Sequence, residues 1–72
     1  MIDIKDIEVI GDFTVRRIRW SQGRLYEDMV EVLDKNNNII ESHNCWSLQQ
    51  AKKRFKNMCI LYAQMGEGKL NE

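Results

Sequence analysis

Long apolar runs are missing from this sequence, and their absence argues against a protein that spans a membrane with helices. No stretch approaches the about 20 consecutive apolar residues that a helix needs to cross a bilayer. The N-terminus MIDIKDIEV alternates apolar with charged residues instead of forming the apolar core of a signal peptide. We therefore expect a cytoplasmic protein with no membrane partner.

An excess of charge of either sign is also missing. The 11 basic and 11 acidic residues leave a net charge of zero, so no overall field draws the chain to a polyanion such as DNA or RNA. The charges nevertheless lie in blocks: residues 13–24 sum to +4, 25–34 to −4 and 47–65 to +4. Any electrostatic binding site would therefore be local.

Groups that carry catalysis or hold metal ions are few. The chain has one histidine and two cysteines, with no CxxC or HxxxH spacing and no glycine-rich phosphate loop. His43 and Cys45 are close in sequence, but two side chains at one strand end do not make a tetrahedral zinc site. A single domain of 72 residues also has little volume for a substrate pocket beside its core. We expect no catalytic activity, cofactor, metal or small-molecule substrate.

The clearest predicted element is a long amphipathic helix over residues 48–65. Ser47 is a natural N-cap, Gln50 stands at the N3 position of a capping box, and Trp46 stands where a hydrophobic staple would. Apolar residues recur at spacings of three and four, which is the period of one helix face: Leu48, Ala51, Phe55, Met58, Cys59, Tyr62 and Met65.

This helix also separates the two cysteines. With a rise of about 1.5 Å per residue, a helix between Cys45 and Cys59 holds them close to 20 Å apart, well beyond the reach of a disulfide. We therefore expect two free thiols. Cys59 should react more slowly than Cys45 because it lies on the core face of the helix.

Three segments with strand character precede the helix, at residues 13–20, 25–33 and 38–44. The connections SQGR and DKNNN supply glycine and asparagine for tight turns, and they are short enough only for antiparallel neighbours. The predicted fold is α+β: a three-stranded antiparallel meander followed by one helix. The isoleucines near the N-terminus suggest a fourth strand or a short helix.

The whole chain reads as a single domain without a linker or an internal repeat. Its parts are residues 1–12 as the N-terminal strand or short helix, 13–44 as the sheet, 47–65 as the helix and 66–72 as a flexible tail after Gly66, which is placed to end the helix.

The arginine-rich stretch RRIRWSQGR, residues 16–24, lies in the first predicted hairpin. If Gln22 and Gly23 form its tip, paired residue numbers sum to 45, and Val15 then lies opposite Val30, whereas a slip of one residue loses such matches. The arginines in this register lie beside acids of the next strand and form cross-strand ion pairs. Those acids are Glu27, Asp28 and Glu31.

The register makes both faces of the sheet half apolar. One face holds Phe13, Val15, Tyr26, Val30 and Val32, and the other holds Ile18, Trp20, Leu25, Met29 and Leu33. One helix covers only one face, so the N-terminal isoleucines, another copy of the chain or a partner protein must shield the second. The alternative is a β-bulge at Arg16–Arg17, which puts Phe13, Val15, Ile18 and Trp20 on one face.

Two resemblances bear on function. The order of three strands and a helix over residues 13–65 resembles, in topology, the domains that lay a three-stranded sheet into the DNA major groove, such as the arm-binding domains of tyrosine integrases. That likeness implies a cationic sheet face, whereas residues 25–33 carry acids and no base. In general character the chain is similar to small accessory proteins of bacteria and their phages or prophages, which implies binding to host or phage macromolecules.

The leading hypothesis is therefore a small protein-interaction module that binds a partner protein or associates as a homodimer. Its surface would centre on Trp20, Leu25 and Met29, because monomers seldom expose a contiguous patch of large apolar groups.

Two other hypotheses remain open. A nucleic-acid-binding accessory protein would use Trp20 with two groups of cations, one on the hairpin and one on the helix. These are Arg16, Arg24, Lys52, Lys53 and Lys56. The least favoured alternative is a fragmentary enzyme subunit in which Cys45 or His43 is reactive.

Overall fold

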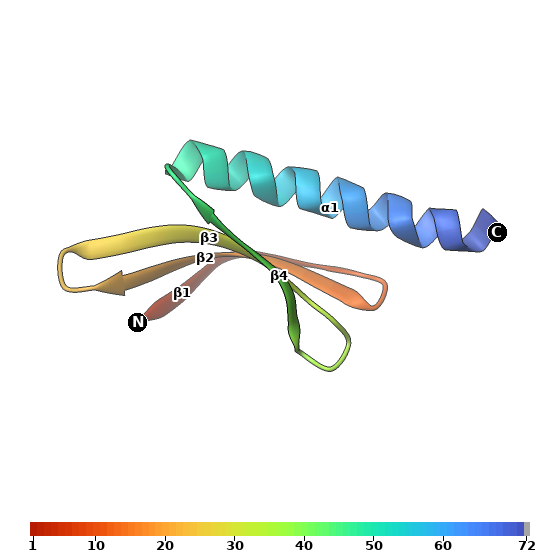
Figure 1. Ribbon diagram of the computed structural model, residues 1–72, viewed down its shortest axis with the longest axis horizontal. Helices are drawn as coiled ribbons and strands as arrows, with labels where there is room; N and C mark the ends of the chain where they lie inside the picture. Colours follow the sequence, from red (N-terminus) through yellow and green to blue (C-terminus); the bar gives the residue numbers. More distant parts are fainter. Residues whose placement is uncertain (72) are drawn as a thin grey trace.

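The protein is a four-stranded antiparallel sheet with one helix lying along it (Figure 1). The computed structural model describes the backbone of residues 1–71 and the side chains of residues 1–65. The strands follow one another in the order β1-β2-β3-β4, so each neighbour in the sheet is also the next strand in the chain. The elements are β1 (Ile2–Ile10), β2 (Phe13–Gln22), β3 (Leu25–Leu33), β4 (Ile39–Cys45) and α1 (Leu48–Asn71). The α+β prediction is confirmed, and the N-terminal segment is a strand.

Tight turns join the strands where the sequence supplies residues that accept a left-handed backbone. Gly11, Gly23 and Asn37 have φ angles of 59°, 61° and 67° in the three successive connections. In the last connection the Asp34 carboxylate accepts hydrogen bonds from the backbone N–H groups of Asn36 and Asn38, at 2.8 and 2.9 Å. The chain can therefore reverse within a few residues.

The register of the first predicted hairpin was wrong by two residues. Paired numbers of β2 and β3 sum to 47, so Trp20 lies opposite Glu27 and Val15 opposite Val32. The turn consists of Gly23 and Arg24, which puts the glycine at the first central position, where a two-residue hairpin needs a positive φ. Because the shift is even, every residue keeps the predicted face of the sheet.

The bulge considered at Arg16–Arg17 is absent, and β2 alternates regularly along its pairing with β3. Irregularities lie instead in β1, where Lys5 is the extra residue between Ile4 and Asp6, and in β4, where Ile40 is the extra residue opposite Val32 and Leu33. Side chains of β2 therefore point alternately to the two faces throughout the strand.

The helix begins as predicted. The backbone N–H of Gln50 donates to Ser47 Oγ at 3.2 Å, and the Gln50 side chain accepts a hydrogen bond from the backbone N–H of Trp46 at 2.6 Å. This is the reciprocal pattern of a capping box, shifted by one residue on the return bond. The predicted staple is wrong, because the Trp46 side chain is 93% exposed and packs against nothing in the core.

The helix does not end at residue 65. It continues through Gly66 to Asn71, into the segment predicted to be a flexible tail. A glycine inside a helix costs about 1 kcal/mol relative to alanine without breaking the backbone hydrogen bonds, and the residues that follow include good helix formers. The side chains of 66–72 lie outside the described residues.

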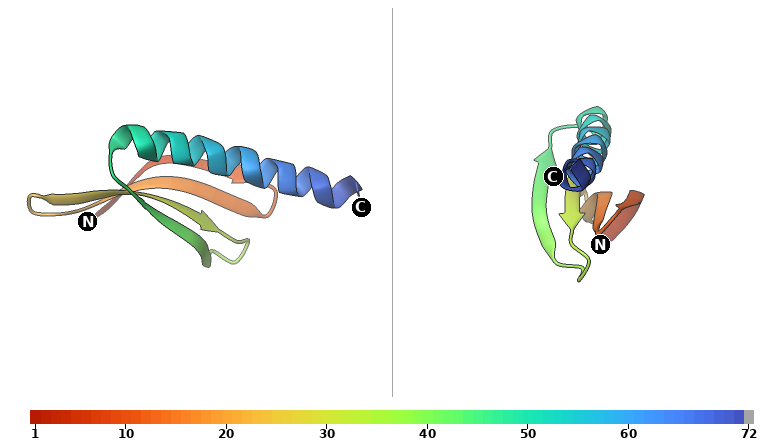
Figure 2. Two further views of the ribbon diagram at one scale, coloured as in Figure 1. Left: turned by 45° about the horizontal axis from the view of Figure 1, so that its top comes forward. Right: turned by 90° about the vertical axis from the view of Figure 1, so that its right-hand side faces the viewer.

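The core lies between the helix and one face of the sheet, as the two views of Figure 2 show. The ring of Tyr62 on the helix lies 4.8 Å from the ring of Phe13 in β2, at a tilt of 57°. Each buried side chain of this kind stabilises the fold by about 1.5–3 kcal/mol relative to exposure. The buried cluster consists of Val15, Val30, Val32, Met58 and Tyr62. We call this side of the sheet the covered face.

Candidate interaction surface

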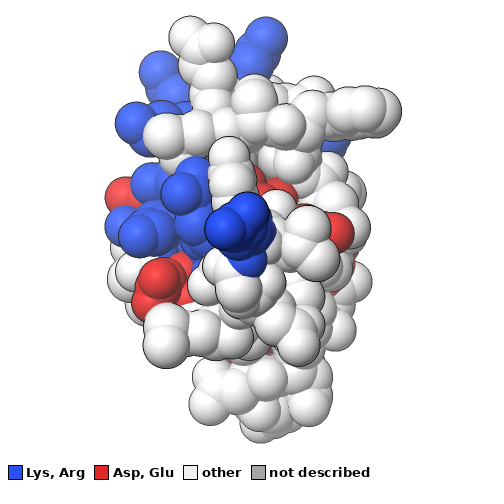
Figure 3. Space-filling model, turned by 90° about the vertical axis from the view of Figure 1, so that its left-hand side faces the viewer, with Lys and Arg blue, Asp and Glu red and all other residues white. Residues whose placement is uncertain are grey.

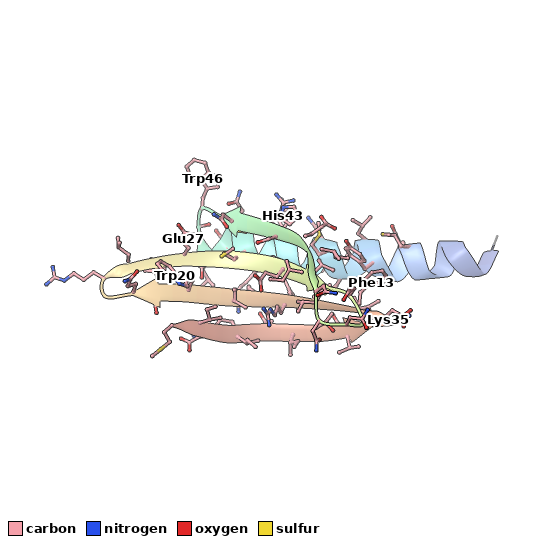
Figure 4. The ribbon with its side chains drawn as sticks, turned by 60° about the horizontal axis from the view of Figure 1, so that its bottom comes forward. Phe13, Trp20, Glu27, Lys35, His43 and Trp46 are labelled. Atoms are coloured by element: carbon pink, nitrogen blue, oxygen red, sulfur yellow. The ribbon has the colours of Figure 1, made fainter. Side chains whose placement is uncertain are left out.

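The opposite side of the sheet, here called the open face, carries no helix (Figures 2 and 4). Residues directly opposite one another in neighbouring strands share a face. The pairs that run across the open face are Ile4 with Ile18 and Ile18 with Met29, and the same alternation places the remaining members. All four strands contribute apolar side chains: Ile2, Ile4, Ile7 and Val9 of β1, Ile18 and Trp20 of β2, Leu25, Met29 and Leu33 of β3, and Ile39 of β4.

The N-terminal isoleucines enlarge this face instead of shielding it. Because β1 is a strand of the same sheet, Ile2 lies beside Trp20, and Ile4 lies beside Ile18, at the same level. Their exposed fractions are 57% for Ile2, 51% for Ile4 and 57% for Ile7. One of the three expected shields, the N-terminal segment, is therefore excluded.

The three residues predicted to form the interaction centre all lie on the open face. Trp20 and Met29 are half-buried, while Leu25 is 70% exposed and lies at the hairpin end, opposite Gln22. The centre of the face is Ile18, which is only 2% exposed although no helix covers it. Flanking side chains on the central strands hide it from water.

Sequence reasoning missed the contribution of β1, which supplies four of the apolar side chains, from Ile2 to Val9. The signal was present in the alternation of IDIKDIEVI, which has the period of a strand. The extra residue Lys5 interrupts that alternation, and this interruption is what left a short helix as an alternative.

The open face is close to electrically neutral. Arg16 Nε donates to Glu31 Oε1 at 2.7 Å, and the two side chains are 24% and 9% exposed. Glu27 is the other charged side chain that β2 and β3 place on this face. The predicted pairing of the hairpin arginines with acids of β3 is confirmed for Arg16 and Arg19, whereas Arg17 pairs with an acid of β1 instead.

Two further arginines are engaged on the covered face. Arg19 donates to both carboxylate oxygens of Asp28, at 2.9 and 3.2 Å, and this pairing raises the pKa of the Arg19 guanidinium. Arg17 donates to Asp6 of β1 at 2.6 Å, and the whole Arg17 residue is only 7% exposed. The Arg19 guanidinium also lies 4.5 Å from the ring centroid of Tyr26. These cations are therefore structural parts of the sheet.

The remaining predicted cations lie on the outer surface. Arg24 is exposed in the β2–β3 turn and takes part in no ion pair among the described side chains. Lys52, Lys53 and Lys56 are exposed on the helix. Figure 3 views the end of the molecule that carries this turn and the start of the helix, and it shows basic side chains over both elements with acids among them. The structure therefore brings the predicted cations to one end without making that end uniformly basic.

The single histidine belongs to a structural network. Its Nε2 lies 3.1 Å from Glu41 Oε1, and the Tyr62 hydroxyl donates to the other carboxylate oxygen. The hydrogen bond from Tyr62 is the main cause that lowers the pKa of Glu41, followed by the one from His43. Burial, together with Glu41, raises the pKa of Tyr62 to about 12. The network ties β4 to the helix.

The two cysteines are free thiols with suppressed acidity. Burial raises the pKa of Cys45, and burial together with the nearby Glu8 raises the pKa of Cys59 to about 12. Both thiols are therefore protonated at neutral pH and are weak nucleophiles. Within residues 1–65, no group of three or more histidine, cysteine or carboxylate side chains is arranged to hold a metal ion.

A shallow hollow lies where β4 meets the helix. Glu27, Asn44, Cys45 and Trp46 line it, and the Trp46 ring projects from this corner (Figure 4). Sequence reasoning assigned Trp46 to the helix start, so its exposure was not expected. Its backbone is held by the capping hydrogen bond from Gln50 while its ring is left in water.

No protein-family model matches the sequence, and neither a curated protein nor a solved structure matches the chain. In the described part of the chain, the helix is not apolar enough over the length needed to cross a membrane.

Proposed function

We propose that this protein is a small, non-catalytic protein-interaction module of bacterial, phage or prophage origin that acts in the cytoplasm. It binds a protein surface, either a partner or a second copy, through the open face. The observation that carries the proposal is the position of β1: Ile2, Ile4 and Ile7 lie in the sheet, more than half exposed, beside the apolar side chains of β2.

The exposed apolar area of the open face favours binding to another protein surface. Burying an apolar side chain of this size contributes about 1.5–3 kcal/mol, and single-chain proteins seldom leave many such groups contiguous and exposed. On the open face the exposed side chains of β1 adjoin Trp20 and Ile18 of β2, and Ile18 in turn adjoins Met29 of β3. A protein surface that covers this region would remove a continuous apolar area from water.

Within that area Trp20, Leu25 and Met29 are the proposed contact centre. Tryptophan and arginine side chains tend to dominate binding energy at protein interfaces, and Trp20 lies here beside the aliphatic side chain of Ile2. The arginine here is Arg16, which is already paired with Glu31 and therefore enters an interface with its charge satisfied.

Two observations support a non-catalytic role. The thiols of Cys45 and Cys59 have raised pKa values, which makes them poor nucleophiles. His43 is engaged with Glu41, and Glu41 is in turn bound by Tyr62, so the only imidazole serves the packing of β4 on the helix.

A photo-reactive amino acid placed on each side of the molecule tests the proposal. Position 7 on the open face and position 60 on the helix are 57% and 47% exposed isoleucines. Irradiation in intact bacterial cells should yield protein adducts from position 7 and few from position 60. Equal yields, or no adduct from position 7, would contradict the proposal.

Nucleic-acid binding is the second candidate function. It is favoured by the exposure of Arg24 and of the three helix lysines at one end of the molecule (Figure 3). Such binding would weaken steeply with salt, with a log–log slope of about −0.9 for each contacted phosphate of duplex DNA. The double variant Lys52→Glu, Lys56→Glu should abolish it. Absence of binding at low salt would remove this candidate, because electrostatic association is strongest there.

A further inference from the structure

Building on the proposed function, we infer that the occupant of the open face is a second copy of this chain. Two sheets would pack face to face about 10 Å apart, as in β-sandwiches, with the two helices on the outside. Each helix would keep its own covered face, so the dimer would form without rearrangement of either copy.

The charge on the open face fits a copy of itself. A two-fold interface places the same surface on both sides, so any net charge would repel its own image. Here the central cation and anion, Arg16 and Glu31, neutralise each other within one chain at 2.7 Å. The outward-facing residues of β1 on this face are all apolar, from Ile2 to Val9. The further charge that β2 and β3 place on this face is Glu27, near the hairpin end, so a strongly charged partner would find little complementary charge here.

The area of the open face also fits. Strands about 4.8 Å apart and about 3.3 Å long per residue make a four-stranded face of roughly 500 Å² in projection. A standard interface takes up about a tenth of a small protein's surface, and the surface of this molecule is 5435 Å². Because a standard interface buries about 800 Å² on each partner, this face is near the lower limit and fits a weak dimer that dissociates on dilution.

The β1 edge of the sheet is less suited to self-association than the open face. The outer strand β1 is bulged at Lys5, and its other side carries Asp3, Asp6 and Glu8. Bulges and charges are the features that prevent one edge strand from pairing with another. The apolar groups of β1 are directed to the open face, not along the edge.

Sedimentation of wild type and two matched variants tests the inference. Wild type should be a dimer that dissociates on dilution from millimolar to micromolar concentration. Ile4→Glu buries a charge at the interface and should weaken the dimer by about 100-fold or more. Ile60→Glu makes the same change on the outer helix surface, at 47% exposure against 51%, and should leave the dimer unchanged.

The circular dichroism spectrum of each variant checks that it is folded. Ile7→Glu provides a second open-face substitution, should Ile4→Glu unfold the chain. A dimer that survives both open-face changes, or one that Ile60→Glu disrupts equally, would overturn the inference.

The fluorescence of Trp20 locates the interface directly. In a Trp46→Phe background Trp20 is the only tryptophan, and its quenching by acrylamide should fall as concentration rises through the dimer range. A dimer whose formation leaves Trp20 quenching unchanged would show that the contact lies elsewhere.

Failure of this inference is separable from failure of the proposed function. A monomer at millimolar concentration that still gives adducts from position 7 would overturn self-association and support a different protein partner. A monomer with no adduct from position 7 would overturn both.

Discussion

The two faces of one sheet have similar sequences and different surroundings. On the covered face Val15, Val30 and Val32 are fully buried under the helix. On the open face Ile2 and Ile7, which are larger and more apolar, remain 57% exposed. The strands supply apolar groups to both faces, and only the helix makes the two faces different. Apolar residues in a strand therefore indicate that a face of the sheet must be covered, but they do not identify the element that covers it.

The open face nevertheless has a buried interior of its own. Ile18 and Leu33 are 2% and 7% exposed without help from the helix. Side chains on the adjacent strands shield them from water, and these neighbouring side chains are themselves partly exposed. The open face thus resembles half of a core, with a sheltered centre and a rim of partly exposed aliphatic groups.

Two methionines offer the strongest test of the contrast. Met58→Ala removes a side chain from the covered core, where it is 8% exposed, and should lower the free energy of unfolding by about 2–4 kcal/mol. Met29→Ala on the open face should cost less, about 1–2 kcal/mol, in the dilute protein, because Met29 is only partly buried and no helix packs over it. Urea denaturation at low concentration measures both. Equal losses would mean that the two faces are equivalent in the isolated chain.

The helix that distinguishes the faces depends on its N-cap. Ser47→Ala removes the oxygen that accepts the Gln50 N–H and should lower the free energy of unfolding by about 1 kcal/mol. Ser42→Ala is the matched control, since Ser42 is exposed in β4, opposite Glu31. Denaturation midpoints should shift for the first variant and hardly at all for the second. An unchanged midpoint for Ser47→Ala would place the effective helix start elsewhere.

The bond between Tyr62 and Glu41 should make the attachment of the helix depend on pH. The lowered pKa of Glu41 means that its contribution is present above the ordinary value of 4.5 and is lost as the pH falls through the folded value. The raised pKa of Tyr62, about 12 against 10, means that its contribution is present below pH 10 and is lost as the pH rises towards 12.

Thermal unfolding as a function of pH checks both limbs. Tyr62→Phe should remove the alkaline loss and reduce the acid loss, because Glu41 keeps only its contact with His43. The effect is modest, since the Glu41 side chain is 35% exposed and solvent screens part of its charge. A wild-type profile identical to that of Tyr62→Phe would contradict the role of this bond.

The labelling rates of the two thiols measure how accessible the covered face is in the native protein. Both cysteines pack against the core cluster, but burial and Glu8 raise the pKa of Cys59 to about 12, whereas the pKa of Cys45 at the end of β4 rises less. In native protein a maleimide should label Cys45 faster than Cys59. Single-thiol variants, Cys45→Ala and Cys59→Ala, assign the two rates. Labelling of Cys59 first would mean that the helix leaves the sheet more readily than β4 does.

Features determined by adjacent residues could be predicted from the sequence. The helix start follows from Ser47 and Gln50, whose hydrogen bonds are local, and the strand β3 matches its predicted bounds of 25–33. The sequence also predicted on which face of the sheet each side chain of β2 and β3 lies, because alternation is a property of the strand and not of its partner.

Features that depend on a choice between two nearly equivalent alternatives could not be predicted from the sequence. The register turned on whether Gly23 is the first or the second residue of the hairpin tip, and both placements match apolar with apolar residues. The helix end turned on Gly66, which can stop a helix or lie within one. The open face was predicted in part, since Trp20, Leu25 and Met29 all lie on it, but its largest exposed share comes from β1, where one inserted residue disturbs the pattern.

The order of the strands has a consequence for the newly made chain. Every strand pairs with the one synthesised just before it, so the sheet can assemble by successive local hairpins, which favours fast folding. The helix comes last. Until residues 48–65 have left the ribosome, Val15 and Val32 are exposed to water like Ile4, and the nascent sheet presents apolar side chains on both faces. Emergence of the helix is therefore the step at which one face of the sheet becomes covered, while the other remains an exposed apolar face.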